Sequence, residues 1–238
     1  MSGWAAKRFW KETTVSVTDT GYQVLLDGRQ VKTPAKTTLI VPTRALAEAI
    51  RTEWDSQDGQ IDPTTMPATR MANAALDKVL TQKTEVVDML AAYGSSDLLC
   101  YRAEAPEELC ARQKKSWDPL LDWMDDAFGV RLSTGFGVMP VAQTPEAERA
   151  MHAQVAKLSH FELAAFHDLV GLSGSLVIAL AVANGRLTGE EAWPLSRVDE
   201  LWQEEQWGPD DEATAVASRK CSEFMAAERH LGLVRSTE

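Results

Sequence analysis

The fold class follows from residues 15–41, which read VSVTDTGYQVLLDGRQVKTPAKTTLIV. The segment opens with two valines separated by one polar residue, and a turn then leads into a second apolar run over residues 22–26. Asp27-Gly28 is a hairpin signal, and residues 38–41 fit one further strand. The sequence therefore predicts a small antiparallel sheet near the N-terminus.

Beyond this sheet the pattern becomes helical. Leu46, Ile50 and Trp54 recur every four residues behind a Pro-Thr start, which suits a helix that packs on the sheet. Helical periodicity then dominates the remainder of the chain. We therefore expect an α+β protein, with a small β-rich N-terminal domain over residues 1–65 and a larger all-helical domain over residues 66–238.

Several signals mark boundaries within the helical part. Gly94 is expected to close a helix over Val86–Tyr93, and Pro119 is expected to kink or split a helix that starts at Pro106. The Gly-rich residues 130–141 predict a short hairpin or a loop. Further helices are expected over residues 71–80, 145–158, 160–171 and 174–184, then from the capping-box pair Thr188 and Glu191, and from Pro209 with the acids that follow it.

The charge of the chain excludes two classes of partner. Its 238 residues carry 24 Lys and Arg against 35 Asp and Glu, a formal charge of −11. That balance argues against nucleic acid and against an anionic membrane surface, both of which attract basic faces. Residues 1–70 are nearly neutral, whereas residues 188–212 hold nine acids and one base, Arg197. The acidity therefore belongs to the helical part.

Cysteine usage and the N-terminus point to the cytoplasm of a bacterium. Cys100, Cys110 and Cys221 are odd in number and widely spaced, which predicts reduced thiols rather than a disulfide framework or a zinc ribbon. The first residues contain no apolar signal core. The most apolar stretch, Leu176 to Ala183, is too short to cross a bilayer, so no membrane insertion is expected.

The sequence contains no convincing catalytic, cofactor or metal motif. Gly135-Phe136-Gly137 lacks the third glycine of a dinucleotide site, and Gly171-Leu172-Ser173-Gly174-Ser175 lacks both the lysine of a phosphate loop and the spacing of a nucleophile elbow. None of the four histidines lies in a metal-binding motif, and the paired carboxylates lie at helix ends or on solvated faces. We therefore expect no enzyme, no cofactor and no metal.

Tryptophan and acid are interleaved near the C-terminal end. Trp193, Trp202 and Trp207 stand among Asp199, Glu200, Glu204 and Glu205. One interpretation is a core stripe with a solvated flank. The other is a protein-binding surface, where large apolar anchors are surrounded by charges that select the partner. Composition alone leaves both open.

An ordered set of short motifs resembles the assembly chaperones of the ATP synthase F1 sector that guard its α subunit, the ATP12 family. The motifs are Lys7-Arg8-Phe9-Trp10, Leu26-Asp27-Gly28-Arg29, Lys32-Thr33-Pro34, Glu53-Trp54-Asp55-Ser56-Gln57, Met66-Pro67, Thr69-Arg70, Asp97-Leu98-Leu99-Cys100-Tyr101-Arg102, Gln113, Trp117-Asp118-Pro119-Leu120-Leu121, Gly174-Ser175, Asp199-Glu200 with Gln203, and Trp207-Gly208. The resemblance runs from about residue 7 to residue 231 and lacks the mitochondrial presequence typical of the family.

The resemblance implies an ATP-independent chaperone that binds the free α subunit, shields its β-facing interface from aggregation and releases it during hexamer assembly. It also implies a β-rich N-terminal domain followed by a helical domain, in agreement with the residue pattern. We expect the chaperone to be a monomer when free. The expected contact residues are Asp199, Glu200, Trp202, Gln203, Glu204, Trp207 and Glu212.

Two rival functions remain at this point. One is an enzyme of unrecognised type with a polar pocket near Asp97 and Arg102, and the other is a generic scaffold for another complex. Trp54 and Trp117 lie on periodic apolar faces, so we expect structural roles for both. The basic pair Lys7-Arg8 fits either client binding or the capping of a strand edge.

Overall fold

The computed structural model describes residues 7–137 and 139–237, which fall into two compact units. Unit 1 runs to Lys83 and takes in Ser159–Ala165 and the residues from Arg229 onward. Unit 2 comprises Thr84–Leu158 and Phe166–Glu228. Residue 65, the expected domain boundary, lies within unit 1, because the helix that follows it packs on the first helix.

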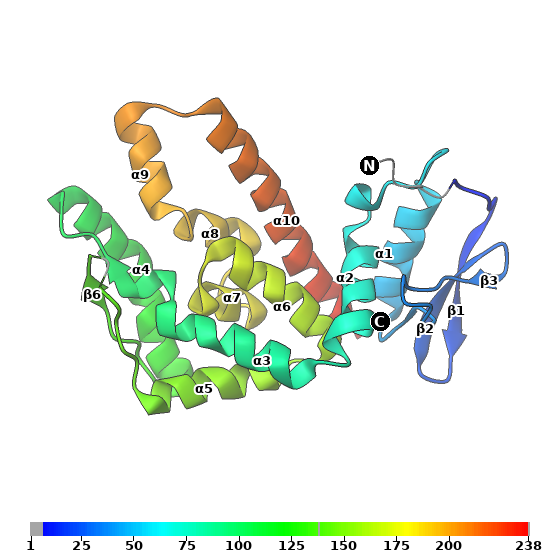
Figure 1. The fold of residues 1–238 in the computed structure, drawn as a ribbon, viewed down its shortest axis with the longest axis horizontal. Helices are drawn as coiled ribbons and strands as arrows, with labels where there is room; N and C mark the ends of the chain where they lie inside the picture. The colour runs from blue at the N-terminus through cyan, green and yellow to red at the C-terminus, as the bar shows by residue number, and fades with distance from the viewer. Residues whose placement is uncertain (1–6, 138, 238) are drawn as a thin grey trace. The chain divides into compact units, whose positions relative to one another are not determined.

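A small antiparallel sheet forms the first part of unit 1. Strand β1 (Thr13–Thr18) pairs along its whole length with β2 (Gly21–Leu26), as the predicted hairpin requires. Short strands β3 (Arg29–Gln30) and β4 (Ile40–Val41) pair with the opposite side of β2. Figure 1 shows strands β1, β2 and β3 together at the N-terminal end of the chain. The turn between β2 and β3 has positive φ at Asp27 (47°) and Gly28 (77°), as turns that match the twist of a two-residue hairpin require.

Helix α1 (Arg44–Asp55) covers one face of this sheet. Thr43 caps its N-terminus by accepting a hydrogen bond from the Leu46 amide, and its buried side chains, among them Leu46 and Ile50, pack on β1 and β2. Unit 1 continues with η1 (Pro63–Thr65), α2 (Pro67–Ala74) and the π-helical segment η2 (Ala75–Val79). This arrangement confirms the expected sheet-and-helix order.

Helices build unit 2. Helix α7 (Leu176–Ala183) is buried at every residue and contacts α4 (Glu107–Phe128) and α8 (Gly189–Leu195). The other elements are α3 (Lys83–Ala92), η3 (Tyr93–Ser96), η4 (Leu98–Cys100), β5 (Tyr101–Arg102), β6 (Gly135–Phe136), α5 (Pro145–Ala156) and α9 (Val198–Trp207). Two helices, α6 (His160–Ser173) and α10 (Asp211–Arg235), contribute residues to both units. The predicted α+β class is confirmed.

The structure refines three local predictions. Pro119 does not split helix α4, in which the side chains on either side of it, Trp117 and Leu120, are anchored in the core. The described residues of 130–141 form mostly loop, and the two-residue strand β6 within them pairs in parallel with β5 rather than in a local hairpin. Helix α3 ends at Ala92, one residue before the predicted end, and Gly94 lies in the following η3, where a Cβ on it would come within 2.3 Å of the Met151 sulfur.

Candidate protein-binding site

Helix α9 carries most of the residues that the sequence nominated for partner binding. It starts after Arg197, buries Val198, packs on α4, and ends at Gly208, whose φ is 87°. Helix α10 then begins beyond the cap residue Asp210, which accepts a hydrogen bond from the Ala213 amide at 2.7 Å. The candidate site therefore lies on the end of α9 and the start of α10 (orange in Figure 1).

Asp199 joins α9 to α4 and is not directed at solvent. Its carboxylate accepts a hydrogen bond from Gln113 Nε2 at 2.7 Å. Gln113 is 2% exposed, and its Oε1 accepts the Ala103 amide at 2.8 Å. This chain of hydrogen bonds satisfies a buried amide and fixes the position of the first turn of α9.

Arg112 of α4 contacts two residues of α9. Its guanidinium donates to both carboxylate oxygens of Glu205, at 2.8 and 2.6 Å, and lies 5.0 Å from the ring centre of Trp202. The hydrogen bond from Arg112 holds the pKa of Glu205 below its ordinary value. Trp202 is half-buried beneath this arginine and is therefore a packing residue rather than a free anchor.

Arg197 pairs with two of the acidic residues of α9. Its guanidinium is 3.2 Å from Glu204 and 4.0 Å from Glu200, and it lies 5.8 Å from the ring centre of Trp193. Glu204 is half-buried in this contact, whereas more than half of the Glu200 side chain is exposed. The negative charge that faces solvent is therefore smaller than the nine acids of residues 188–212 suggest.

Four of the seven nominated residues remain available to a partner. Trp207 is 79% exposed, and Glu200, Gln203 and Glu212 are exposed as well. Asp199, Trp202 and Glu204 are committed to contacts within unit 2. We call the exposed group, Glu200, Gln203, Trp207 and Glu212, the Trp207 surface.

The arginines that organise this site were missed from the sequence. Arg112 and Glu205 are 93 positions apart, and no local pattern pairs residues at that separation. An indirect signal exists, because a carboxylate that packs against a neighbouring helix is usually paired with a cation. Only the tertiary structure decides that Arg112 and Arg197 supply them.

The rival polar pocket around Asp97 is a set of structural contacts. Asp97 is fully buried, and its carboxylate accepts from the Leu99 amide at 3.0 Å, from Ser175 Oγ at 2.8 Å and from the Val177 amide at 2.9 Å. Burial raises the pKa of this carboxyl despite those donors. The site therefore holds the start of α7 in place.

Arg102 is occupied in a similar way. Its Nε donates to the Leu99 carbonyl at 2.8 Å, its Nη2 is 2.9 Å from Asp118, and its guanidinium lies 5.3 Å from the ring centre of Trp117. Among the described residues, hollows of about 550 and 470 Å³ are lined by residues other than Asp97 and Arg102.

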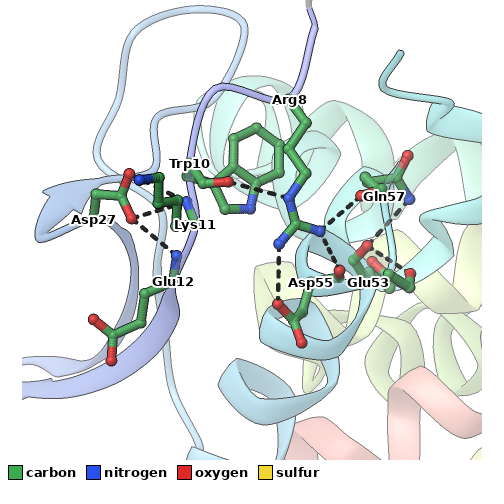
Figure 2. Close-up of polar contacts among 9 residues, drawn as sticks. Arg8, Trp10, Lys11, Glu12, Asp27, Glu53, Asp55 and Gln57 are labelled. Carbon is green, nitrogen blue, oxygen red and sulfur yellow. Dashed lines mark hydrogen bonds and ion pairs between the residues drawn. The ribbon is translucent and has the colours of Figure 1, made fainter. Parts of the chain in front are cut away.

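Arg8 and Trp10 of the N-terminal motif make their contacts within unit 1 (Figure 2). The Arg8 guanidinium donates to the Asp55 and Gln57 carbonyls at the end of α1 and is 3.4 Å from the Asp55 carboxylate. It also lies 5.4 Å from the ring centre of Trp10, which is 3% exposed. Arg8 therefore caps a helix C-terminus, which is a structural role.

The motif around Trp54 has the same character. Glu53 accepts hydrogen bonds from the Ala68 and Thr69 amides at 2.7 and 2.8 Å, and so caps the start of α2. The Trp54 ring lies 5.2 Å from Trp10. In unit 2, Trp117 is fully buried and donates its indole N–H to the Leu195 carbonyl at 2.8 Å. Both tryptophans lie in packing environments.

Residues 7–137 and 139–237 contain no group of three or more His, Cys, Asp or Glu side chains that could hold a metal ion. Burial raises the pKa of the Cys100 thiol to about 12. None of the helices described is both long and apolar enough to span a membrane.

The structure is a two-unit α+β fold in which helix α9 ends on an exposed tryptophan, Trp207. The family model for the ATP12 chaperone protein matches residues 7–125. This chain belongs to that family of ATP synthase assembly chaperones.

Relatives support this assignment over nearly the whole chain. The crystal structure of Atp12 from Paracoccus denitrificans is 45% identical, covers 97% of this chain with 99% of its own, and superposes with a TM-score of 0.94. A crystal structure from Agrobacterium tumefaciens is 42% identical, covering 96% of this chain and 86% of its own, with a TM-score of 0.92. The mitochondrial protein atp12 of Schizosaccharomyces pombe is 26% identical, over 93% of this chain and 80% of its own.

Proposed function

We propose that this protein binds the free α subunit of the F1 sector and covers the surface that the β subunit later occupies. The observation that carries the proposal is Trp207, an indole that is 79% exposed in a chain whose family consists of assembly chaperones. Tryptophan is the residue type most enriched among the anchors of protein interfaces, which makes an exposed indole a candidate contact. The Trp207 surface is therefore the proposed contact with the client.

The chemistry of this surface suits reversible binding. Buried aromatic anchors contribute most of the affinity at protein interfaces, and charged residues around them steer encounter and orientation. Glu200, seven residues before Trp207 on α9, and Glu212, in the first turn of α10, supply that charge. An unassembled subunit exposes an apolar interface that tends to aggregate, and a chaperone that masks it needs no catalytic group.

The protein acts without ATP and without enzymatic turnover, as a monomer when free, in the bacterial cytoplasm. Arg112 and Arg197 preorganise α9 by holding Trp202, Glu204 and Glu205, so little side-chain entropy is lost there when the client binds.

Substitution of the exposed residues tests the proposal. We expect Trp207→Ser to weaken binding of the purified α subunit by about tenfold or more, as is typical for an aromatic anchor. The double variant Glu200→Lys with Glu212→Lys should lower the association rate and its dependence on salt. Binding is measured by surface plasmon resonance, and aggregation of the α subunit by light scattering.

The control is Asp125→Lys with Asp126→Lys on the last turn of α4, which changes the net charge by the same amount on two exposed residues of the same unit. The control should bind as the unchanged chain does. If the Trp207 and glutamate variants also bind normally, the contact surface lies elsewhere. A chain that binds other assembly subunits but not α would instead favour the generic scaffold.

A further inference from the structure

The outer edge of the small sheet in unit 1 is open. Strand β1 pairs with β2 on one side, and in the part of the chain that the structure describes no strand pairs with its other side. The Asp27 amide donates to the Glu12 carbonyl at 3.0 Å, one position before β1 begins. Because bonded and non-bonded pairs alternate in an antiparallel ladder, Thr14, Ser16 and Thr18 bond to β2.

The backbone groups of the intervening residues therefore face outward. These are the N–H and C=O groups of Thr13, Val15 and Val17, and no hydrogen bond to them is found among the described residues. Val17 is 74% exposed, which leaves its end of the edge accessible. We call the outward side of Thr13–Thr18 the β1 edge.

The other side of the same sheet is protected in the ways that proteins commonly use. Strand β3 is two residues long and carries Arg29, and β4 is two residues long and is followed by Pro42. Strand β1 has six residues, which read TTVSVT, with no charge, no proline and no glycine. Five of the six are β-branched, so the strand is well suited to pairing.

The two faces of β1 specify the side chains of an added strand. Val15 lies opposite Val24, which is 1% exposed, so Val15 and Val17 share the face of the sheet that packs on α1, where Val15 is half-buried and Val17 remains exposed. The other face is polar, and Gln23 Nε2 donates to Ser16 Oγ there at 2.9 Å. A matching segment would therefore alternate between apolar side chains beside the valines and polar side chains beside Ser16.

A second copy of this chain could also occupy such an edge, and two observations oppose that occupant. Each copy carries a formal charge of −11, so two copies repel each other. A six-residue edge is about 20 Å long, too short to bury by itself the roughly 1,200–2,000 Å² of a stable interface. The occupant must therefore also be held elsewhere, as a client bound at the Trp207 surface would be.

We infer that the β1 edge binds an extended segment of the client by strand addition, with alternating apolar and polar side chains. This inference rests on the proposed function, because the α subunit is the client that it names. The ordered segment before β1 favours this use: the Asp27 carboxylate accepts the Lys11 and Glu12 amides at 3.0 and 2.9 Å, and Arg8 is fixed to α1. The edge is thus held rigid before the client arrives.

Proline at residue 17 tests the edge without disturbing the sheet. Val17→Pro removes an outward N–H that β2 does not use, so the fold should be unchanged by circular dichroism and thermal unfolding. We expect its affinity for the purified α subunit to fall about tenfold, since the N–H bond is lost and the ring blocks the edge. Val17→Thr keeps the N–H and β-branching and should bind within about threefold of the unchanged chain.

Amide hydrogen exchange gives a second readout. In the free protein the amides of Val15 and Val17 should exchange fast, and those of Thr14 and Ser16 slowly. In the complex with the α subunit, Val15 and Val17 should gain at least about tenfold protection. Normal binding by Val17→Pro, together with unprotected edge amides in the complex, would overturn the inference and leave the Trp207 surface standing.

The remaining outcomes are also decisive. Edge amides that are protected in the free protein, with a protection that rises with concentration, would assign the edge to a second copy. Failure of the unchanged chain to bind the α subunit would overturn the proposed function and this inference together.

Discussion

At the scale of single residues, Asp97 shows how one carboxylate organises unit 2. It brings together η4 and the first turn of α7, two segments about 78 residues apart, by accepting from Leu99, Ser175 and Val177. An aspartate with no charged partner in a core is expensive, so its retention requires all these donors. Asp97, which the sequence suggested as part of a polar pocket, is thus a structural residue that connects η4 to α7 in the core of unit 2.

Removal of Asp97 is expected to destabilise the fold strongly. Asp97→Ala leaves several buried donors unpaired and should lower the free energy of unfolding by about 3 kcal/mol, against about 1 kcal/mol for Ser175→Ala, which removes one capping hydroxyl. Because burial raises the pKa of Asp97, its contribution is fully present below the unfolded value of 3.8 and declines as pH rises through the folded pKa.

Urea unfolding at pH 4.5 and pH 7.5 measures both effects. The deficit of Asp97→Ala relative to the unchanged chain should be larger at the lower pH. A deficit below that of Ser175→Ala, or one that grows with pH, would contradict this account of the site.

At the scale of elements, the sheet of unit 1 depends on the close approach of β4 to the β1–β2 turn. Gly21 has φ of 151°, and a Cβ on it would lie 2.4 Å from the Val41 carbonyl oxygen. Gly28 also has positive φ, at 77°, but an added Cβ there would meet nothing within 4 Å. Both glycines have positive φ, so a comparison of alanine substitutions at Gly21 and Gly28 isolates the effect of the steric clash at Gly21.

We expect Gly21→Ala to destabilise the protein by about 3 kcal/mol or more, because the clash is with backbone and β4 must move. Gly28→Ala should cost about 1 kcal/mol, the cost of a left-handed alanine. Thermal and urea unfolding of both variants give the comparison. Equal losses would mean that β4 yields easily and that the close approach is not needed.

The elements differ in how far the sequence predicts them. The β1–β2 hairpin and the cap of α8 are local, so alternation and the Thr188–Glu191 spacing were sufficient. The pairing of β5 with β6 joins segments 34 residues apart, and a Gly-rich stretch carries no register of its own. Pro119 does not split α4, because burial of Trp117 and Leu120 outweighs one missing backbone donor.

The same division applies to the candidate site. Trp207 could be nominated from composition, since an indole among acids is unusual wherever it lies. The internal contacts of Trp202, Glu204 and Asp199 could not be predicted from the sequence. Trp202 and Asp199 contact residues of α4, and Glu204 contacts Arg197 because of the turn of α9 on which it lies. Composition therefore predicts the region of the candidate site, and tertiary contacts decide which of its side chains remain exposed to a partner.

At the scale of the whole molecule, unit 1 is discontinuous in sequence. Besides the N-terminal residues it takes in Ser159–Ala165 and the end of α10. Within the unit, Thr43 Oγ1 donates to the Leu233 carbonyl at 2.6 Å, Arg235 is 2.6 Å from Glu162, and Leu231 is 4% exposed. The N-terminal sheet thus belongs to a core that the C-terminal residues complete.

A chain that ends at Glu228 should therefore lose order in unit 1. We expect the slow amides of Thr14 and Ser16 to exchange at least about tenfold faster than in the unchanged chain, because buried contacts from α10 are absent. A chain that ends at Arg235 is the control and should retain protection. Unchanged exchange in the shorter chain would show that unit 1 holds together without the end of α10.

This discontinuity has a consequence for biosynthesis. A ribosome delivers the strands of unit 1 first and Leu231 more than two hundred residues later, so the first unit to be translated is among the last to be finished. Throughout that interval the nascent sheet lacks its complete core, and the open β1 strand is already outside the ribosome. This chain belongs to a family of assembly chaperones, and during its own synthesis it is itself an incompletely folded chain with an unpaired strand edge.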